Sequence, residues 1–276
     1  MKLFEYNTGK GILPEGHQGI SPSQLSRFFD DGTNWYRETL MGEAPVFQGN
    51  TATHLGTCVH VAAEMYTNTG SVDHSLINNY INSITDVEVD KHLIRQQYPT
   101  MASTLISAYL SKVSNTGVET EKYVYHELLP NIYVKGSIDR YDPKRRRIVD
   151  FKTMGSLDSA RVPTSFSRAY WFQQMAYAWM LSKKGTPIDY LELVFVSRDN
   201  TGRISEKTGK PMKDYPSEVN SVIHEITTTD MEIIDNTLQL VAHSIQHWND
   251  NPDHRYLLAK DWRLYNKPKV KPLWAD

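Results

Sequence analysis

The sequence predicts an α/β (α+β) protein in which a central mixed β-sheet is flanked by helices. Residues 21–114 carry mostly helical periodicity. Between residues 122 and 153 the pattern changes to short stretches rich in β-branched and aromatic residues, which is typical of strands. Helical and strand patterns then alternate as far as residue 247, and this order favours helices layered on a sheet.

The N-terminal part is expected to be helical. A helix is predicted to begin at Ser21, with the serine as N-cap and Pro22 in the first turn. A second helix is predicted for residues 55–66. Residues 74–114 continue the helical pattern, with a break at residues 85–87 and a further break or kink at Pro99, because proline disfavours helix at the residue before it.

The remaining elements follow from strand composition and turn chemistry. Asp142-Pro143 is a typical start of a type I turn, so the strands on either side of it should form a hairpin. Residues 199–216 are polar and contain glycine, which predicts a long loop. The predicted strands are 122–128, 132–141, 147–153, 190–196 and 221–227, and the predicted later helices are 165–181 and 229–247.

These elements are expected to form one domain over residues 1–276. Residues 1–118 would be its mainly helical part, residues 119–200 the sheet core, and residues 201–276 a loop, a strand, a C-terminal helix and a basic tail.

Composition narrows the class of protein. The formal net charge is −2 over 276 residues, and Cys58 is the single cysteine. One cysteine excludes an internal disulfide and a cysteine-ligated iron–sulfur cluster. No apolar run reaches the length of a membrane-spanning helix, and the N-terminus has no apolar signal region, so we expect an intracellular, cytoplasmic enzyme.

Basic residues gather in two places despite the balanced net charge. The first group is Lys144-Arg145-Arg146-Arg147, and the second is Lys260, Arg263, Lys267, Lys269 and Lys271. Such groups either bind phosphates or form ordinary solvated surface.

The predicted hairpin carries the residues with the clearest chemistry. On a strand, alternate side chains share a face, so Asp150 and Lys152 point one way while Val149 and Phe151 point into the core. The first strand of the hairpin brings Asp139 back towards Asp150. Two carboxylates beside one ammonium make a site for a hard cation such as Mg²⁺. Two such ions support phosphodiester hydrolysis by holding the entering and leaving oxygens.

Two helices add further polar residues. His60 and Glu64 are four residues apart, so they share one helical face, and a neutral imidazole there makes Mn²⁺ as suitable as Mg²⁺. Gln173 and Tyr177 share a face of the helix after the third strand in the same way. Each pattern taken alone is also common in helices without any catalytic role.

Taken in order, the motifs Gly56-x-x-x-His60-x-x-x-Glu64, Gly136-x-x-Asp139, Asp150-x-Lys152 and Gln173-x-x-x-Tyr177 resemble the RecB-like branch of the PD-(D/E)XK nuclease superfamily. The resemblance covers about residues 21–196 and is closest in style to RecE-type and phage recombination exonucleases. It implies a restriction-endonuclease-like core with an N-terminal helical elaboration.

The resemblance also implies roles for individual residues. His60, Asp139, Asp150 and the Phe151 carbonyl would bind metal, with two ions per site, and Lys152 would be catalytic. Gln173, Tyr177 and Arg140 would contact substrate, as would Arg145 and Arg146 in the basic turn. Glu64 would be a further catalytic residue or ligand, and Glu127 an additional one.

The resemblance implies DNA as the substrate and, as the activity, removal of nucleotides from the ends of linear duplexes in recombination, repair or phage DNA metabolism, in the cytoplasm of a bacterial or phage-infected cell. Relatives of this kind often work beside a single-strand annealing protein and form rings. The resemblance therefore leaves open whether this chain has an annealing partner and whether it forms a homo-oligomer. Many RecB-like nucleases adjoin a helicase, but no Walker A loop occurs here. Two alternatives remain: an endonuclease acting on branched or single-stranded DNA, and a non-catalytic DNA-binding protein that retains the fold.

Overall fold

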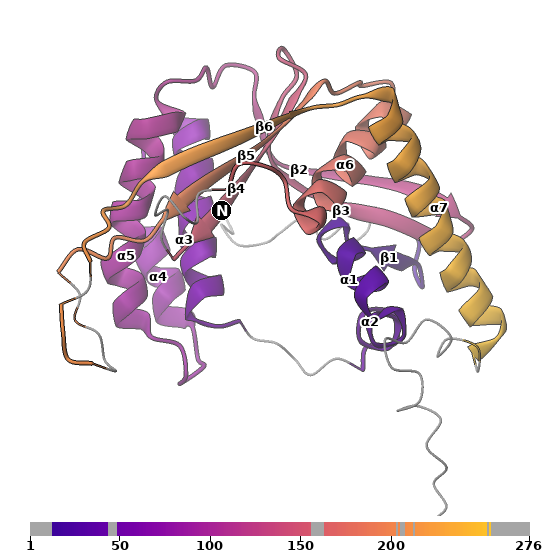
Figure 1. Cartoon of the computed structure of the whole chain (residues 1–276), viewed down its shortest axis with the longest axis horizontal. Coiled ribbons are helices and arrows are strands. Elements are labelled where there is room, and N and C mark those ends of the chain that lie inside the picture. Colours follow the sequence, from indigo (N-terminus) through magenta and orange to yellow (C-terminus); the bar gives the residue numbers. More distant parts are fainter. Residues whose placement is uncertain are drawn as a thin grey trace, which may run out of the picture.

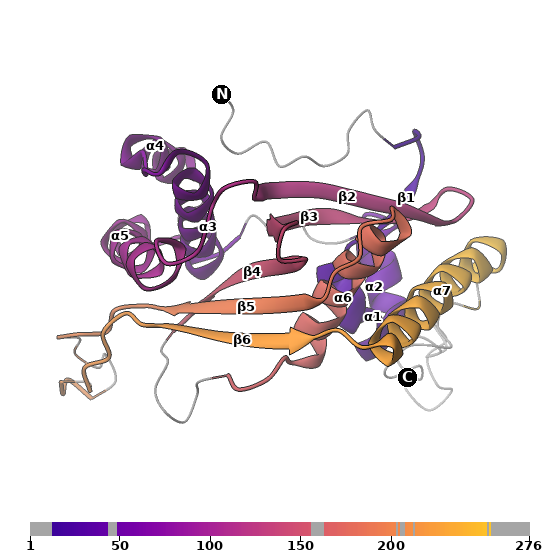
Figure 2. The same cartoon turned by 90° about the horizontal axis from the view of Figure 1, so that it is seen from above.

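The computed structural model describes residues 13–43, 49–155, 163–202, 204, 208–211, 213–252 and 254. In this part of the chain, a six-stranded mixed sheet lies between two groups of helices, as Figures 1 and 2 show. The fold class predicted from the sequence is therefore confirmed. The second basic group, Lys260 to Lys271, lies outside the described residues.

The N-terminal segment begins with a short strand that the sequence pattern did not predict. Strand β1 (Gln18–Ile20) leads into a 3₁₀ turn (Pro22–Gln24), helix α1 (Leu25–Asp30) and helix α2 (Gly32–Thr39). Ser21 stands at the N-cap of the 3₁₀ turn, but its side chain makes no capping hydrogen bond. The cap of α2 is Asp31, whose carboxylate accepts from the Asn34 amide.

Three helices form the next group. Asn50, Asp73 and Asp90 cap the amino ends of α3 (Thr51–Thr69), α4 (His74–Ser83) and α5 (Lys91–Leu105). The predicted break at residues 85–87 falls between α4 and α5. Of the break or kink predicted at Pro99, the break is wrong, because α5 continues through that residue and passes into a π-helical turn (Ile106–Leu110), and the kink stays a prediction.

The strands and later helices lie within three residues of their predicted bounds. The strands are β2 (Glu119–Leu129), β3 (Ile132–Asp142), β4 (Arg147–Met154), β5 (Tyr190–Ser197) and β6 (Val219–Glu225), and the helices are α6 (Arg168–Lys183) and α7 (Thr228–Asp250).

The sheet order is β1-β3-β4-β5-β6, and β2 pairs along the other edge of β3. Strands β2, β3 and β4 are antiparallel neighbours, whereas β4 and β5 run parallel and are joined through α6. A parallel pair needs such a crossover, which places α6 across one face of the sheet. In Figure 1, α3, α4 and α5 stand on the left and α1, α2, α6 and α7 on the right.

Alternation along the strands divides the core between these two helical groups. Val149 and Phe151 of β4 pack into the cluster formed by α3, α4 and α5, as predicted. Ile148 packs into the cluster formed by α1, α2, α6 and α7. Asp150 and Lys152 therefore project on the α6 face of the sheet. No helix in the described ranges is long and apolar enough to span a membrane.

Candidate active site

The site forms where β3 and β4 part. The two strands pair through Arg140↔Val149, Tyr141↔Ile148 and Asp142↔Arg147, and the pairing stops there. Beyond it, the Asp139 carboxylate occupies the space between the strands, and its Oδ2 accepts a hydrogen bond of 3.0 Å from the Phe151 amide. The Asp139 side chain thus takes the place of a backbone hydrogen bond between β3 and β4, and it is held where the two strands separate.

Helix α3 brings a histidine to this carboxylate. His60 Nδ1 lies 3.2 Å from Asp139 Oδ2, and the ring meets Phe151 edge-on with centroids 6.2 Å apart. The His60 and Asp139 side chains are 26% and 17% exposed, so solvent reaches both. Gly56 permits this approach, because a Cβ there would lie 3.3 Å from the Thr153 hydroxyl at the end of β4.

Asp150 and Lys152 form the second half of the site. Lys152 Nζ lies 2.6 Å from Asp150 Oδ2, and the two side chains are 20% and 3% exposed. Lys152 also donates to Gln173 Oε1 at 3.2 Å, while Gln173 Nε2 donates to Asp150 Oδ1 at 3.2 Å. The ammonium lies 5.1 Å from the centre of the Tyr170 ring. Helix α6 therefore orients both members of the pair.

Two further residues of α6 complete this side. Gln174 is fully buried and donates from Nε2 to Asp150 Oδ1 at 2.8 Å. Tyr177 is buried against Gly136, where an added Cβ would lie 2.9 Å from the Tyr177 hydroxyl and 3.3 Å from Pro22 Cδ. The glycine of the Gly-x-x-Asp motif is therefore needed for close packing of α6 on β3.

The electrostatics reflect many charges in a small, partly buried volume. Burial disfavours the His60 imidazolium, but the Asp139 carboxylate outweighs burial and raises the pKa of His60 to about 9. Burial raises the pKa of Asp150 to about 6, although Lys152 opposes the shift. Burial likewise disfavours the charged form of Lys152, but Asp150 and Asp139 outweigh it and hold the pKa of Lys152 above its usual value.

Glu121 of β2 is a member of this cluster that the sequence analysis missed. The pairs Thr120↔Arg140 and Lys122↔Ile138 place it opposite Asp139, and its backbone adopts a φ of 46°. The Ser137 hydroxyl donates to its carboxylate at 3.0 Å. Burial, followed by repulsion from Asp139, raises the pKa of Glu121 to about 7.

Comparison with known proteins identifies the family. The sequence profile of the PD-(D/E)XK nuclease superfamily matches residues 19–252. The chain belongs to this superfamily. That Asp139 and the Asp150-Phe151-Lys152 triplet occupy the acidic, acidic and lysine positions for which the superfamily is named stays a prediction. A search of curated protein sequences found no significant match.

Solved structures were compared as well. A candidate exonuclease from Eubacterium rectale is 15% identical, with a TM-score of 0.55, and the match covers 98% of this chain and 94% of that one. A phage-related exonuclease from Haemophilus somnus is 14% identical over 85% and 96% of the two chains, with a TM-score of 0.40. An alkaline exonuclease from Laribacter hongkongensis is 8% identical over 87% and 94%, with a TM-score of 0.41. At these identities, the first likeness shows a shared fold and nothing finer.

Not every residue proposed from the sequence reaches this PD-(D/E)XK site. Glu127 is exposed and accepts from the Asn131 amide in the β2–β3 turn, six residues along β2 from Glu121. Glu64 is partly buried on the α3 face that carries His60, and burial raises its pKa. Glu64 therefore borders the cluster, whereas Glu127 does not.

The three arginines also lie apart from the acidic cluster. Arg140 is 2% exposed and donates to Asn115, so its expected contact with DNA stays a prediction. Arg145 lies 3.3 Å from Asp142 and Arg146 lies 2.7 Å from Asp189. Both stand in the turn at the paired end of β3 and β4, away from the split end, and their binding of phosphate stays a prediction.

The donor set suits a hard divalent cation, and PD-(D/E)XK nucleases generally use divalent metals. Within the described residues, no three acidic, histidine or cysteine side chains already converge in a metal-binding arrangement. Asp139 and Asp150 instead contact the internal cations His60 and Lys152. Glu121 and Asp150 have raised pKa values because they are buried near other carboxylates, and a bound cation would relieve that repulsion. The residues therefore fit a divalent ion.

Proposed function

We propose that this protein is a divalent-metal-dependent deoxyribonuclease that removes nucleotides from the ends of linear duplex DNA. The observation that carries the proposal is the junction of His60, Asp139, Asp150 and Lys152 at the split of β3 and β4, in a chain of the PD-(D/E)XK nuclease superfamily. The exonucleolytic part of the proposal rests on the order of the motifs and on the resemblance of the sequence to recombination exonucleases.

Each side chain has a role that follows from its contacts. His60, Asp139, Asp150 and the Phe151 carbonyl would hold Mg²⁺ or Mn²⁺, with Glu121 available for a second ion. A bound divalent ion supplies Lewis acidity to the scissile phosphate and lowers the pKa of the attacking water. Asp139 is kept as a carboxylate, since His60, Lys152 and the Phe151 amide outweigh burial and lower its pKa.

Lys152 acts as a cation rather than a base in this proposal. Its raised pKa keeps it charged at neutral pH, so the ammonium stabilises the negative charge that develops on the phosphate. Gln173 holds both Lys152 and Asp150 and thereby sets their separation. Tyr177 is buried against Gly136, so its contribution is to seat α6 rather than to touch DNA.

Digestion of matched DNA substrates tests this proposal. The purified protein is incubated with end-labelled linear duplex and with covalently closed circles of the same sequence, in Mg²⁺, in Mn²⁺ and in EDTA. We expect loss of the linear DNA from its ends with either metal, intact circles, and no digestion in EDTA. Cleavage of the circles would favour the endonuclease, and no cleavage of any DNA would favour the non-catalytic DNA-binding protein. The predicted annealing partner and ring-forming self-association belong to the same proposal and need separate binding and size measurements.

A further inference from the structure

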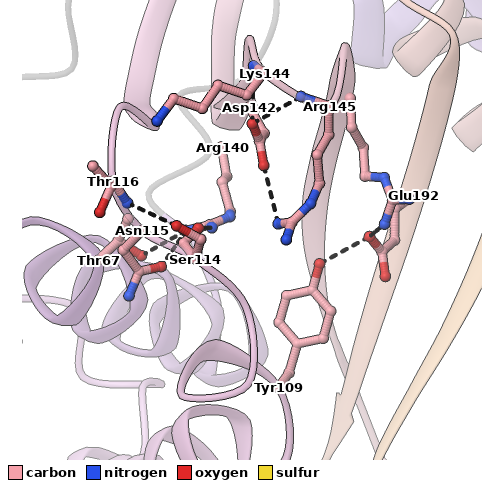
Figure 3. A network of polar contacts seen from close by, with 11 residues as sticks. Thr67, Tyr109, Ser114, Asn115, Thr116, Arg140, Asp142, Lys144, Arg145 and Glu192 are labelled. Atoms are coloured by element: carbon pink, nitrogen blue, oxygen red, sulfur yellow. Dashed lines mark hydrogen bonds and ion pairs between the residues drawn. The ribbon is translucent and has the colours of Figure 1, made fainter.

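Arg140 follows Asp139 directly and makes a set of hydrogen bonds that the proposed mechanism does not use. Its side chain is 2% exposed. Nη1 donates to Asn115 Oδ1 at 2.9 Å and to Thr67 Oγ1 at 3.3 Å, and Nη2 donates to the Ser114 carbonyl at 2.8 Å. Figure 3 shows the guanidinium directed at these three residues, away from the Tyr109–Glu192 pair.

All three acceptors are neutral oxygens. Among the described residues, no carboxylate lies within ion-pair distance of Arg140, and burial lowers its pKa. A buried charge without a paired counter-charge typically adds less stability than a well-packed apolar side chain of similar size. The hydrogen bonds of Arg140 therefore fix the relative positions of the segments that they join more than they add net stability to the fold.

The geometry concerned is the position of α3 relative to β3. His60, Glu64 and Thr67 lie at i, i+4 and i+7, so they share the face of α3 that meets β2 and β3. His60 contacts Asp139, and Thr67, about 10 Å further along the helix axis, contacts the next residue, Arg140. A third link lies beside Thr67, where Asn68 and Thr120 exchange hydrogen bonds of 2.9 and 3.2 Å.

Consecutive residues of one strand thus hold the same helix at two separate points. Asp139 holds the site end of the α3 face, and Arg140 holds its distal end together with the Ser114–Asn115 loop. If only the first of these two links remained, α3 could pivot about it, and the separation of His60 from Asp139 would vary.

We propose that Arg140 is a positioning residue, which fixes α3 on β3 so that His60 and Asp139 approach one cation together. This inference rests on the proposed metal-dependent function. Residues that orient metal ligands from outside typically change metal affinity or activity by about 10–100-fold when mutated. We therefore expect Arg140→Lys to weaken Mn²⁺ binding by about 10-fold, while the rate at saturating Mn²⁺ stays within about threefold of the parent.

The matched control is Arg147→Lys. Arg147 is a partly buried arginine of the same hairpin that pairs with Glu192 of β5 at 2.9 Å, and within the described ranges no hydrogen bond or ion pair joins it to α3. Both variants lose a guanidinium fork, so both should lower the melting temperature. Only Arg140→Lys should change Mn²⁺ affinity. Asn115→Ala removes one acceptor of Arg140 without altering β3, and a threefold loss of Mn²⁺ affinity is expected, which covers the case in which Arg140→Lys does not fold.

The experiment measures Mn²⁺ affinity by calorimetry and, separately, the ¹⁵N shifts of the His60 ring in metal-free protein. We expect the ring signals to change in Arg140→Lys and Asn115→Ala but not in Arg147→Lys, because the His60–Asp139 contact loosens only in the first two. Equal Mn²⁺ affinity and unchanged ring signals in both Arg140→Lys and Asn115→Ala would overturn the inference. A parent protein that cuts no DNA, with the ring signals still changed as expected, would overturn the proposed function alone.

Discussion

Removing the Lys152 ammonium should destabilise the metal-free protein in a way that depends on pH. The variant is Lys152→Met, which keeps the length and apolar stem of the side chain. Removal of one partner from a buried ion pair costs about 3–5 kcal/mol, because the other charge is left unpaired. Lys152 is 20% exposed and Asp150 3% exposed, so solvent screens part of this cost and we expect roughly 2–3 kcal/mol at pH 8.

The pH dependence follows from Asp150. Its pKa of about 6 in the folded protein exceeds the ordinary value, so the stability gained from protonation is complete at low pH and is lost as the pH rises through about 6. In Lys152→Met that pKa rises further, because the ammonium that lowers it is gone. At pH 5.5 Asp150 is mostly protonated in both proteins, and the cost of the variant should fall below about 1 kcal/mol.

The assay is thermal unfolding in EDTA at pH 5.5 and pH 8. For a protein of this size the expected loss at pH 8 is roughly 5–10 °C in Tm. The double variant Asp150→Asn/Lys152→Met removes both charges and should recover most of this loss. Mg²⁺ should also stabilise Lys152→Met at pH 8, by about 2.7 kcal/mol at 100 times its Kd. An equal loss of Tm at both pH values would refute this reasoning.

Three other predictions follow from individual side-chain environments. Gly136→Ala should lower the free energy of unfolding by about 1–3 kcal/mol and reduce DNA hydrolysis, because its Cβ would meet Tyr177 Oη at 2.9 Å. Gly155→Ala is the control, since an added Cβ there has nothing within 4 Å and should leave thermal stability unchanged. Equal losses in the two variants would contradict the packing role of Gly136. In EDTA, Glu121→Gln should have the same Tm as the parent at pH 5 and a higher Tm at pH 8.5. The folded-state pKa of Glu121 is raised to about 7, so the stability that its protonation contributes is lost above that pH. A pH-independent difference in Tm would count against this. Neutralising Arg145 and Arg146 should make the plot of log DNA affinity against log salt concentration less steep, by about 0.9 for each DNA phosphate that the two arginines bind. An unchanged slope would leave these arginines as partners of Asp142 and Asp189 only.

The sequence predicted the parts of the site that are local in the chain. Asp150 and Lys152 are two residues apart on one strand, and Asp139 lies on the other strand of the same hairpin, so alternation and turn chemistry bring them together. The helices that cover the sheet were likewise predicted from a local property of the chain, the periodicity of their apolar residues. The burial of Arg140 and its hydrogen bonds to Thr67, Asn115 and the Ser114 carbonyl depend on segments distant in the chain, so no local pattern could predict them.

Glu121 could not be found in this way. Its place depends on the register between β2 and β3, which is set across a turn and shifts between Glu127 and Leu129. The predicted strand, residues 122–128, also began after Glu121 and contained only Glu127, whereas β2 begins at Glu119. Strand β1 was missed because three residues, Gln18–Ile20, are too few to show periodicity.

The most direct test of the central claim compares the parent with Asp139→Asn in hydrolysis of linear duplex DNA with Mn²⁺. Asparagine can still accept the hydrogen bond from the Phe151 amide, so the fold should be kept while the negative charge is lost. We predict at least about a 10³-fold lower rate, with a far-ultraviolet circular dichroism spectrum unchanged from the parent. Equal rates in the two proteins would contradict the assignment of the active site.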